Sequence, residues 1–296
     1  THPEASLEDL MAFVPGPDLP AGGMIVGLDG IREAYRTGRG KFLTRATAHV
    51  ESVSPRRKGI VVTELPYMVG PEKVIARIKE AVGSKKLQDL TDRKHGTRLV
   101  ISVKNGYNPE AVLAQLYKHT PLEDSFGINN VSLVDGQPHT LGLRELLEVF
   151  VRHRLTVVTR RTRFRLGKRR ERAHLVDGLL IAILDIDEVI AVIRSSDDAA
   201  TARTRLMQVF DLTEPQAGYI LELQLRRLTK FSVIELEKER DELAREIEAL
   251  EAILADDVLL RRVVSRELAA VAEQFGTPRR TVLLEASGER VTSSAA

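Results

Sequence analysis

Residues Phe150–Leu180 read FVRHRLTVVTRRTRFRLGKRRERAHLVDGLL. Between Arg152 and Arg172 this stretch carries ten Lys or Arg residues and one acid, Glu171, within a helical spacing of apolar residues. A helix with this charge repels itself unless acidic side chains or phosphates lie nearby. A later stretch, Glu235–Glu251, has eight acids against three bases. The two stretches therefore predict oppositely charged helices that pair as an antiparallel hairpin.

Apolar periodicity extends this hairpin in both directions. Apolar side chains recur at steps of three and four from Leu143 onward, and the return segment keeps one heptad register from Leu236 to Phe275 with three polar breaks. Sustained spacing of this kind is typical of a coiled coil. We expect the arms at residues 142–194 and 230–280.

The tip expected at residues 195–229 contains two helical patterns, Ala199–Phe210 and Glu214–Leu228. A tip of about 35 residues is too small to bury all the apolar residues of the second pattern. An exposed apolar patch on a projecting arm marks an interface, and a two-fold contact would be self-complementary. The alternative is that these side chains pack only on the end of their own coiled coil. The interface residues that we predict are Ile220, Leu221, Leu223, Leu225 and Leu228.

Residues 1–141 follow another pattern, in which short apolar segments alternate with turn signals. β-branched runs predict strands, prolines at the first turn open two helices, and Ser6 with Asp9 forms a capping box. The fold class is therefore α+β, a mixed domain followed by the coiled coil and its tip. After Thr281 the composition turns to Ser, Gly and Ala, which predicts a disordered tail at 281–296. The expected elements are Ser6–Val14, Ile60–Thr63, Pro71–Val82, Leu99–Val103 and Pro109–Lys118.

Composition narrows the function classes. The chain has 296 residues, 43% apolar content and a net charge of +2. The absence of cysteine excludes disulfides, thiolate metal sites and cysteine nucleophiles. There is no signal peptide and no apolar run long enough for a membrane span, so we expect a cytoplasmic protein. Residues 32–58 hold eight bases and two acids, a patch that would attract a polyanion. Because the chain opens at Thr1 without an initiator methionine, we expect a piece of a longer protein.

Three motifs suggest chemistry, and each has a simpler interpretation. Thr37–Lys41 reads TGRGK but lacks the first glycine and the Ser/Thr of a phosphate loop. It fits a glycine-terminated helix followed by a strand, or a phosphate-backbone contact. The acids at 185, 187 and 188 are too close in sequence to converge on a metal from a helix. His153 lies between two arginines, which suits packing or a phosphate neighbour better than a catalytic base.

Seven blocks resemble, in order, the A subunits of bacterial type IIA DNA topoisomerases, gyrase and topoisomerase IV. They are VPGPDLPAGG at 14–23, IREAYRTGRGK at 31–41, TELPY at 63–67, SFGINNVSLVDGQP at 125–138, the basic helix, LTEPQAGYILELQLRRLT at 212–229 and AEQFGTPRRT at 272–281. The resemblance implies a tower domain over residues 6–141, then a coiled coil with a dimerisation globule. The compact tip favours topoisomerase IV, although many gyrases share it.

The resemblance also implies the function. The whole enzyme breaks both strands of one duplex with paired tyrosines, passes a second duplex through the gap and reseals the break. It uses ATP and Mg²⁺ through a B subunit, in an A2B2 complex on double-stranded DNA. Towers flank the cut duplex, and the coiled-coil tips form an exit gate that holds the homodimer.

The residues that this resemblance assigns to DNA are Arg36, Arg39, Lys41, Arg45 and Tyr67. The family nucleophile is the tyrosine of an Arg-Tyr pair, and none of the five tyrosines here follows an arginine. We therefore assign no catalytic residue and no metal ligand to this chain. The alternative function is a non-catalytic coiled-coil arm that organises DNA, against which the TGRGK and SFGIN blocks argue.

Overall fold

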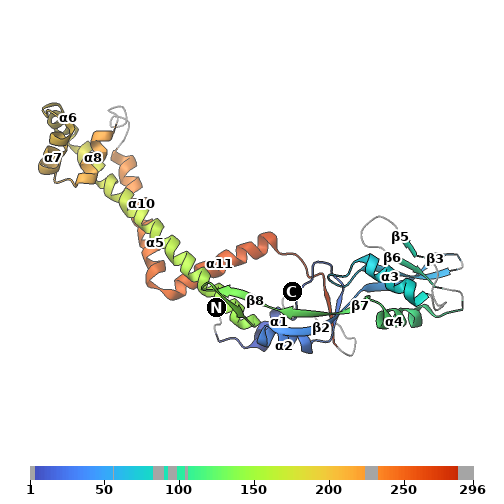
Figure 1. Ribbon diagram of the computed structural model, residues 1–296. Coiled ribbons are helices and arrows are strands. Elements are labelled where there is room, and N and C mark those ends of the chain that lie inside the picture. The colour runs from blue at the N-terminus through green and yellow to red at the C-terminus, as the bar shows by residue number, and fades with distance from the viewer. Residues whose placement is uncertain are drawn as a thin grey trace. The chain divides into compact units, whose positions relative to one another are not determined.

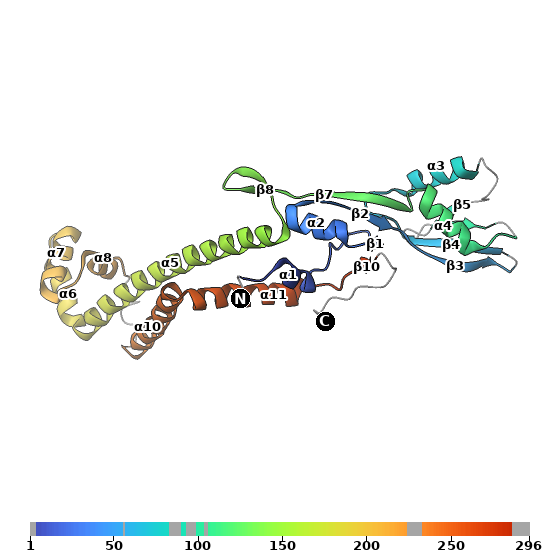
Figure 2. The same ribbon diagram turned by 90° about the horizontal axis from the view of Figure 1, so that it is seen from below.

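A computed structural model describes residues 4–55, 57–82, 90–92, 99–103, 106–223 and 233–285. The chain divides into two compact units. One comprises His2–Val151 with Phe275–Ala296, and the other centres on Arg152–Gln274. Helix α5, Leu143–Leu184, runs through the boundary between them (Figures 1 and 2). Small sheets combined with helices, one of them 42 residues long, agree with the predicted mixture of α and β structure.

The first unit contains a four-stranded sheet in the order β10-β1-β2-β7. Helix α2 packs on β2 and covers one face of this sheet. The core between them includes Ile25, Ile31, Phe42 and Leu283. The elements are α1 (Leu7–Phe13), β1 (Met24–Val26), α2 (Asp29–Thr37), β2 (Arg39–Arg45), β7 (Glu123–Asn129) and β10 (Val282–Leu284).

The prediction of a disordered tail from residue 281 is wrong at its start. Val282–Leu284 form β10, which pairs in parallel with β1. Asp18 fixes this return, because its carboxylate accepts hydrogen bonds from the backbone N–H groups of Arg280 and Thr281, at 3.1 and 2.9 Å. Residues 286–296 of the predicted tail lie outside the described residues.

A second sheet in the same unit has the order β3-β4-β6-β5 and carries α3 and α4 on one face. The predicted helices are confirmed here, since α3 spans Pro71–Val82 and α4 spans Pro109–His119. The predicted strands are confirmed as parts of β4 and β6. Ser6 and Asp9 form the expected capping box of α1. The strands are β3 (Thr47–Ser54), β4 (Arg57–Glu64), β5 (Leu90–Asp92) and β6 (Leu99–Ser102).

A two-stranded hairpin, β8 (Val131–Val134) and β9 (Gln137–Thr140), precedes α5. Asp135 and Gly136 both have positive φ, 52° and 83°, as a tight two-residue hairpin turn requires. This turn is one of the turn signals with which apolar segments alternate in residues 1–141, here Asp135-Gly136-Gln137-Pro138. Val131 and Leu133 are exposed on the hairpin, Leu133 at 75%.

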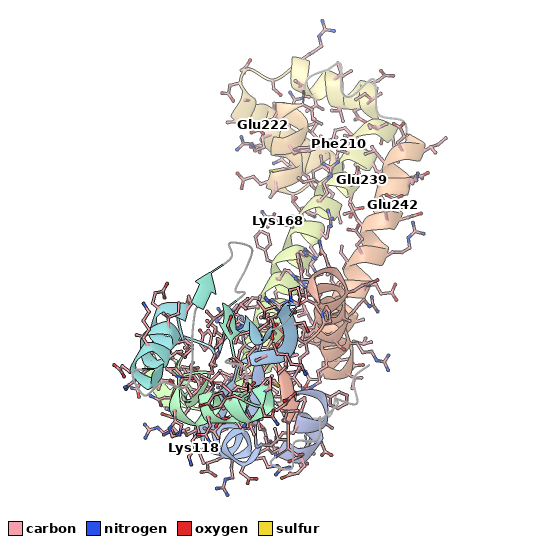
Figure 3. All side chains as sticks on the ribbon, turned by 90° about the vertical axis from the view of Figure 1, so that its right-hand side faces the viewer. Lys118, Lys168, Phe210, Glu222, Glu239 and Glu242 are labelled. Atoms are coloured by element: carbon pink, nitrogen blue, oxygen red, sulfur yellow. The ribbon has the colours of Figure 1, made fainter. Side chains whose placement is uncertain are left out.

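The second unit is helical. In Figure 1, α6, α7 and α8 lie together at the far end of α5, and Figure 3 marks Phe210 and Glu222 there. Their core also includes Leu179 of α5 and Leu236 of α10. None of the described helices is long and apolar enough to cross a membrane. The remaining helices are α6 (Ile186–Arg194), α7 (Ala199–Phe210), α8 (Glu214–Glu222), α10 (Val233–Ala255) and α11 (Asp257–Phe275).

Three boundaries in this unit correct the sequence prediction. The first arm ends at Leu184, because Asp185 interrupts the helix and α6 packs with the tip. Helix α8 ends at Glu222, since Leu223 is extended. The return arm is two helices, not one. At its break the Asp256 carboxylate accepts the Val258 N–H at 2.7 Å and starts α11, and Figures 1 and 2 show the bend.

Ion pairs show that α5 and the return helices run antiparallel. Arginines early in α5 bind an acid late in the return helices, whereas arginines late in α5 bind acids earlier in them. Arg154 binds Glu267 of α11 at 2.8 Å, whereas Arg172 binds Glu239 of α10 at 2.7 Å. Figure 3 shows Lys168 on α5 and Glu239 and Glu242 on α10. The side-by-side arrangement of a basic and an acidic helix is therefore observed.

Candidate nucleic-acid interface

The candidate interface is built on the connection between α2 and β2. Helix α2 ends at Thr37 because Gly38 follows in the left-handed conformation, with φ of 79°, and its N–H donates to the Ala34 carbonyl at 2.8 Å. A Cβ at Gly38 would lie 2.6 Å from the Leu141 carbonyl oxygen, so only glycine fits. The structure confirms that TGRGK is a glycine-terminated helix followed by a strand.

Strand alternation then divides the side chains of β2 between two faces. Phe42 is buried on the face that α2 covers, whereas Arg39 and Lys41 are exposed on the opposite face, here called the outer face of β2. Strand β7 places Asn129 beside Arg39 and Gly127 beside Lys41. Among the residues that the structure describes, neither cation has an acid within ion-pair distance. The outer face of β2 thus presents two unneutralised cations beside small or uncharged neighbours.

Arg45 lies at the other end of the same face but is engaged within the protein. Its guanidinium forms an ion pair with Glu123 at 2.5 Å and lies over the Tyr117 ring, 4.7 Å from the centroid. The hydroxyl of Tyr117 donates to the Ala46 carbonyl at 3.1 Å. Arg45 therefore has a structural role in holding β2 to β7 and α4, in contrast to Arg39 and Lys41.

Arg36 belongs to α2 and so lies on the other side of the sheet. It forms an ion pair with Glu33 and lines a hollow of about 530 Å³ between α1 and α2. The lining of this hollow has a net negative charge, which would repel a phosphate group. The charged residues of the lining are four acids, Glu8, Asp29, Glu33 and Glu285, and two bases, Arg32 and Arg36.

Tyr67 also lies on the core side. Its ring meets Phe126 edge to face at 5.4 Å between centroids, and Phe126 meets Phe42 at 5.6 Å. The five predicted DNA contacts are thus not one cluster, and only Arg39 and Lys41 share an open face. The predicted glycine-terminated helix was the sequence signal that could have separated Arg36 from Arg39 and Lys41, since it places Arg36 on the helix and the other two on the following strand.

The predicted dimer residues are also divided. Ile220 is 1% exposed and belongs to the core of its own tip, so it is not available to a partner. Leu221 and Leu223 are half-buried at the edge of that core. Leu225 and Leu228 lie outside the described residues.

Two of the described tyrosines do not have the lowered pKa of an activated nucleophile. Burial raises the pKa of Tyr35 to about 12 and also raises the pKa of Tyr117, which is the opposite of what a tyrosine nucleophile needs. His153 is exposed on α5. Within the described ranges no three acidic or histidine side chains are grouped so that they could hold a metal, and this includes the acids at 185, 187 and 188.

Comparison with known proteins supplies the family. The family model for the A subunit of DNA gyrase/topoisomerase IV matches residues 1–269. The DNA gyrase A subunits of Staphylococcus aureus strain NCTC 8325 and Staphylococcus epidermidis strain ATCC 12228 are each 43% identical to this chain over 286 residues. The match covers 95% of this chain and 32% of each relative, so the chain spans about a third of their length. This chain belongs to the family of DNA gyrase and topoisomerase IV A subunits.

Proposed function

We propose that this chain is part of the breakage-reunion subunit of an ATP-dependent type II DNA topoisomerase, which passes one duplex through a transient double-strand break. The family match supports this assignment. Within that subunit the first unit would act as the tower that flanks DNA. The helical unit would act as the coiled-coil arm whose tip forms the exit gate of a homodimer. No observation on the described residues favours a non-catalytic arm instead.

The cleavage chemistry is assigned elsewhere in the enzyme. Since no tyrosine follows an arginine in this chain, the covalent nucleophile would lie in a preceding part of the subunit. The family resemblance is the basis on which we assign Mg²⁺ and ATP to the partner B subunit of an A2B2 complex. This piece alone should then bind DNA without cutting it. The relatives named above are gyrase subunits, so the preference for topoisomerase IV gains no support from them.

The outer face of β2 is the observation that carries the DNA-flanking role. Arg39 and Lys41 are exposed on β2, which β7 pairs along its whole length, and Gly127 leaves open space beside Lys41. A rigid sheet with free cations suits the phosphate backbone, which binds through charge and positions the protein without reading sequence. We therefore expect weak binding to any duplex that falls steeply with salt.

Binding of a labelled duplex at 50 to 200 mM salt tests this role. The double variant Arg39→Ala/Lys41→Ala should weaken binding equally for unrelated sequences. It should also reduce the slope of log affinity against log salt by about 2, since each phosphate contact contributes about 0.9. The matched control is Arg32→Ala/Arg36→Ala, which removes the same charge from the α2 side and should leave the slope unchanged. Equal losses in both variants would show a net-charge effect and contradict the assignment.

A further inference from the structure

The part of α5 that follows Arg152 carries a local excess of positive charge. Residues 152–165 contain six arginines, and residues 261–267 of α11 add three more. These two segments contain one acidic residue, Glu267, and both Arg154 and Arg161 bind it. The hydrogen bond from Arg161, aided by the charges of Arg161, Arg154 and Arg165, holds the pKa of Glu267 below its ordinary range. Glu267 is therefore already shared and neutralises little of the excess.

The next turns of α5 are balanced. Arg169 forms an ion pair with Glu246 at 2.5 Å, and Arg170 forms one with Glu251 at 2.5 Å. Lys168 binds Glu171 on its own helix at 2.9 Å. The basic residues of α5 near the tip are thus paired with acids. The excess of positive charge lies nearer the start of the helix, at residues 152–165. Pairing within the arm does not explain why the sequence keeps the remaining arginines.

Three of these arginines point away from the return helices. With about 100° per residue, Arg152, Arg160 and Arg163 lie roughly 120° to 200° around α5 from Val158, which is fully buried. Arg154 and Arg161, which bind Glu267 of α11, lie within about 60° of Val158, so this side of α5 faces the return helices. All three are exposed, and no ion pair joins them to any other described residue. We call them the outer arginine stripe.

Small residues share this face of α5, among them Thr156 and, about one turn beyond Arg163, Gly167. Thr156 has a short side chain, and its hydroxyl donates its proton to the Arg152 carbonyl at 3.0 Å. Gly167 has no atom within 4 Å of where its Cβ would be. A rise of 1.5 Å per residue gives a stripe length of about 16 Å from Arg152 to Arg163. A duplex presents roughly ten phosphates over that length, at one charge per about 1.7 Å of axis.

We propose that the outer arginine stripe binds the phosphate backbone of double-stranded DNA, at a second site separate from the outer face of β2. This inference rests on the proposed function only in taking DNA as the polyanion. Free guanidinium groups along a continuous helix match a regular line of phosphates, and such contacts position a duplex without reading its sequence. A bound duplex also relieves the mutual repulsion of these arginines.

Duplex binding by variants of the whole chain tests the proposal. The triple variant Arg152→Ala/Arg160→Ala/Arg163→Ala should reduce the salt slope by about 2 to 3, since each phosphate contact contributes about 0.9. The matched control is Lys168→Ala/Arg169→Ala/Arg170→Ala. It removes three cations from the same helix, but these cations already have acidic partners, so its slope should equal that of the parent chain. Circular dichroism should show undiminished helix in both, since alanine favours helix.

Equal slopes in the two triple variants would overturn the proposal. It would also fail if single-stranded DNA bound more tightly than duplex and Phe164→Ala abolished that preference. Phe164 is 67% exposed one turn from Arg160 and could stack on bases. The variant Arg39→Ala/Lys41→Ala, measured in parallel, separates the two sites. If it alone lowers the slope, the tower role stands and the stripe is refuted.

Discussion

At the residue scale, two glycines set the position of Lys41. A Cβ on Gly30 would lie 1.9 Å from the Lys41 carbonyl oxygen, and a Cβ on Gly40 would lie 2.2 Å from the Gly30 carbonyl oxygen. Both contacts involve backbone atoms, which cannot turn aside as a flexible side chain can. Helix α2 therefore packs on β2 at backbone distance, and this packing holds the strand that carries the exposed cations.

The variant Gly40→Ala tests this packing. The added methyl group should push α2 away from β2 and destabilise their contact by about 1–3 kcal/mol, the usual range for overpacking. Hydrogen exchange of peptides from α2 and β2 should then be faster by about 5- to 150-fold. Gly127→Ala is the control on the neighbouring strand, where a Cβ meets nothing within 4 Å. Unchanged exchange in Gly40→Ala would mean that α2 and β2 do not pack this closely.

At the element scale, the carboxylate of Asp18 helps to hold β10 against β1. Burial alone would raise the pKa of Asp18, but hydrogen bonds from Thr281 and Arg280 and the charge of Arg279 outweigh it and lower this pKa below its ordinary value of 3.8. A group with a lowered pKa stabilises the folded state fully above its unfolded pKa, and that contribution is lost as the pH falls. The attachment of β10 should therefore weaken below about pH 4.

Hydrogen-exchange protection of the Val282 N–H, which donates to the Gly23 carbonyl at 2.9 Å, reports on this attachment. Protection should fall between pH 5 and pH 3 in the parent chain. In Asp18→Ala it should be low at pH 6 and nearly independent of pH, because the titrating group is gone. Equal pH dependence in both proteins would show that another group controls β10.

Local signals explain which elements could be predicted from the sequence. Pro71, Pro109 and the Ser6–Asp9 pair act within one helical turn, so the sequence places α3, α4 and α1 closely. β10 has no such signal, because the Leu19–Thr281 hydrogen bond that accompanies it joins residues 262 apart. The break at Asp256 falls beside Asp257, one of the three polar breaks in the heptad register, but the apolar positions on both sides keep one register and so predict a continuous arm.

The candidate site shows the same limit. A contiguous motif suggested that Arg36, Arg39 and Lys41 act together, yet α2 carries Arg36 on the other side of the sheet. The partner that neutralises Arg45 is Glu123, 78 residues away in sequence. The excess charge of α5 could be seen from composition alone. Which arginines of α5 remain unpaired could not be predicted, because that depends on which acids the return helices place opposite them.

At the scale of the whole molecule, the tip is the part expected to meet a second copy of the chain. Among the described residues, the tip core includes Leu206 and Ile220, which are at most 1% exposed. Apolar side chains remain outside that core, among them Val209 at 50% exposure. A dimer contact would therefore use the surface of the tip and not its core. A test should change residues at the edge of the core, such as Leu221 and Leu223, and not Ile220.

The double variant Leu221→Arg/Leu223→Arg should convert a dimer into a folded monomer. Both side chains are half-buried at the edge of the tip core, so each arginine can reach water while its charge opposes a self-complementary apolar contact. Light scattering gives the mass, and circular dichroism checks that the helices persist. The control is Leu133→Arg, at a 75% exposed position of the β8–β9 hairpin, which should stay dimeric. If Leu133→Arg becomes the monomer while the tip variant stays dimeric, the dimer contact lies in the first unit and the exit-gate role of the tip fails.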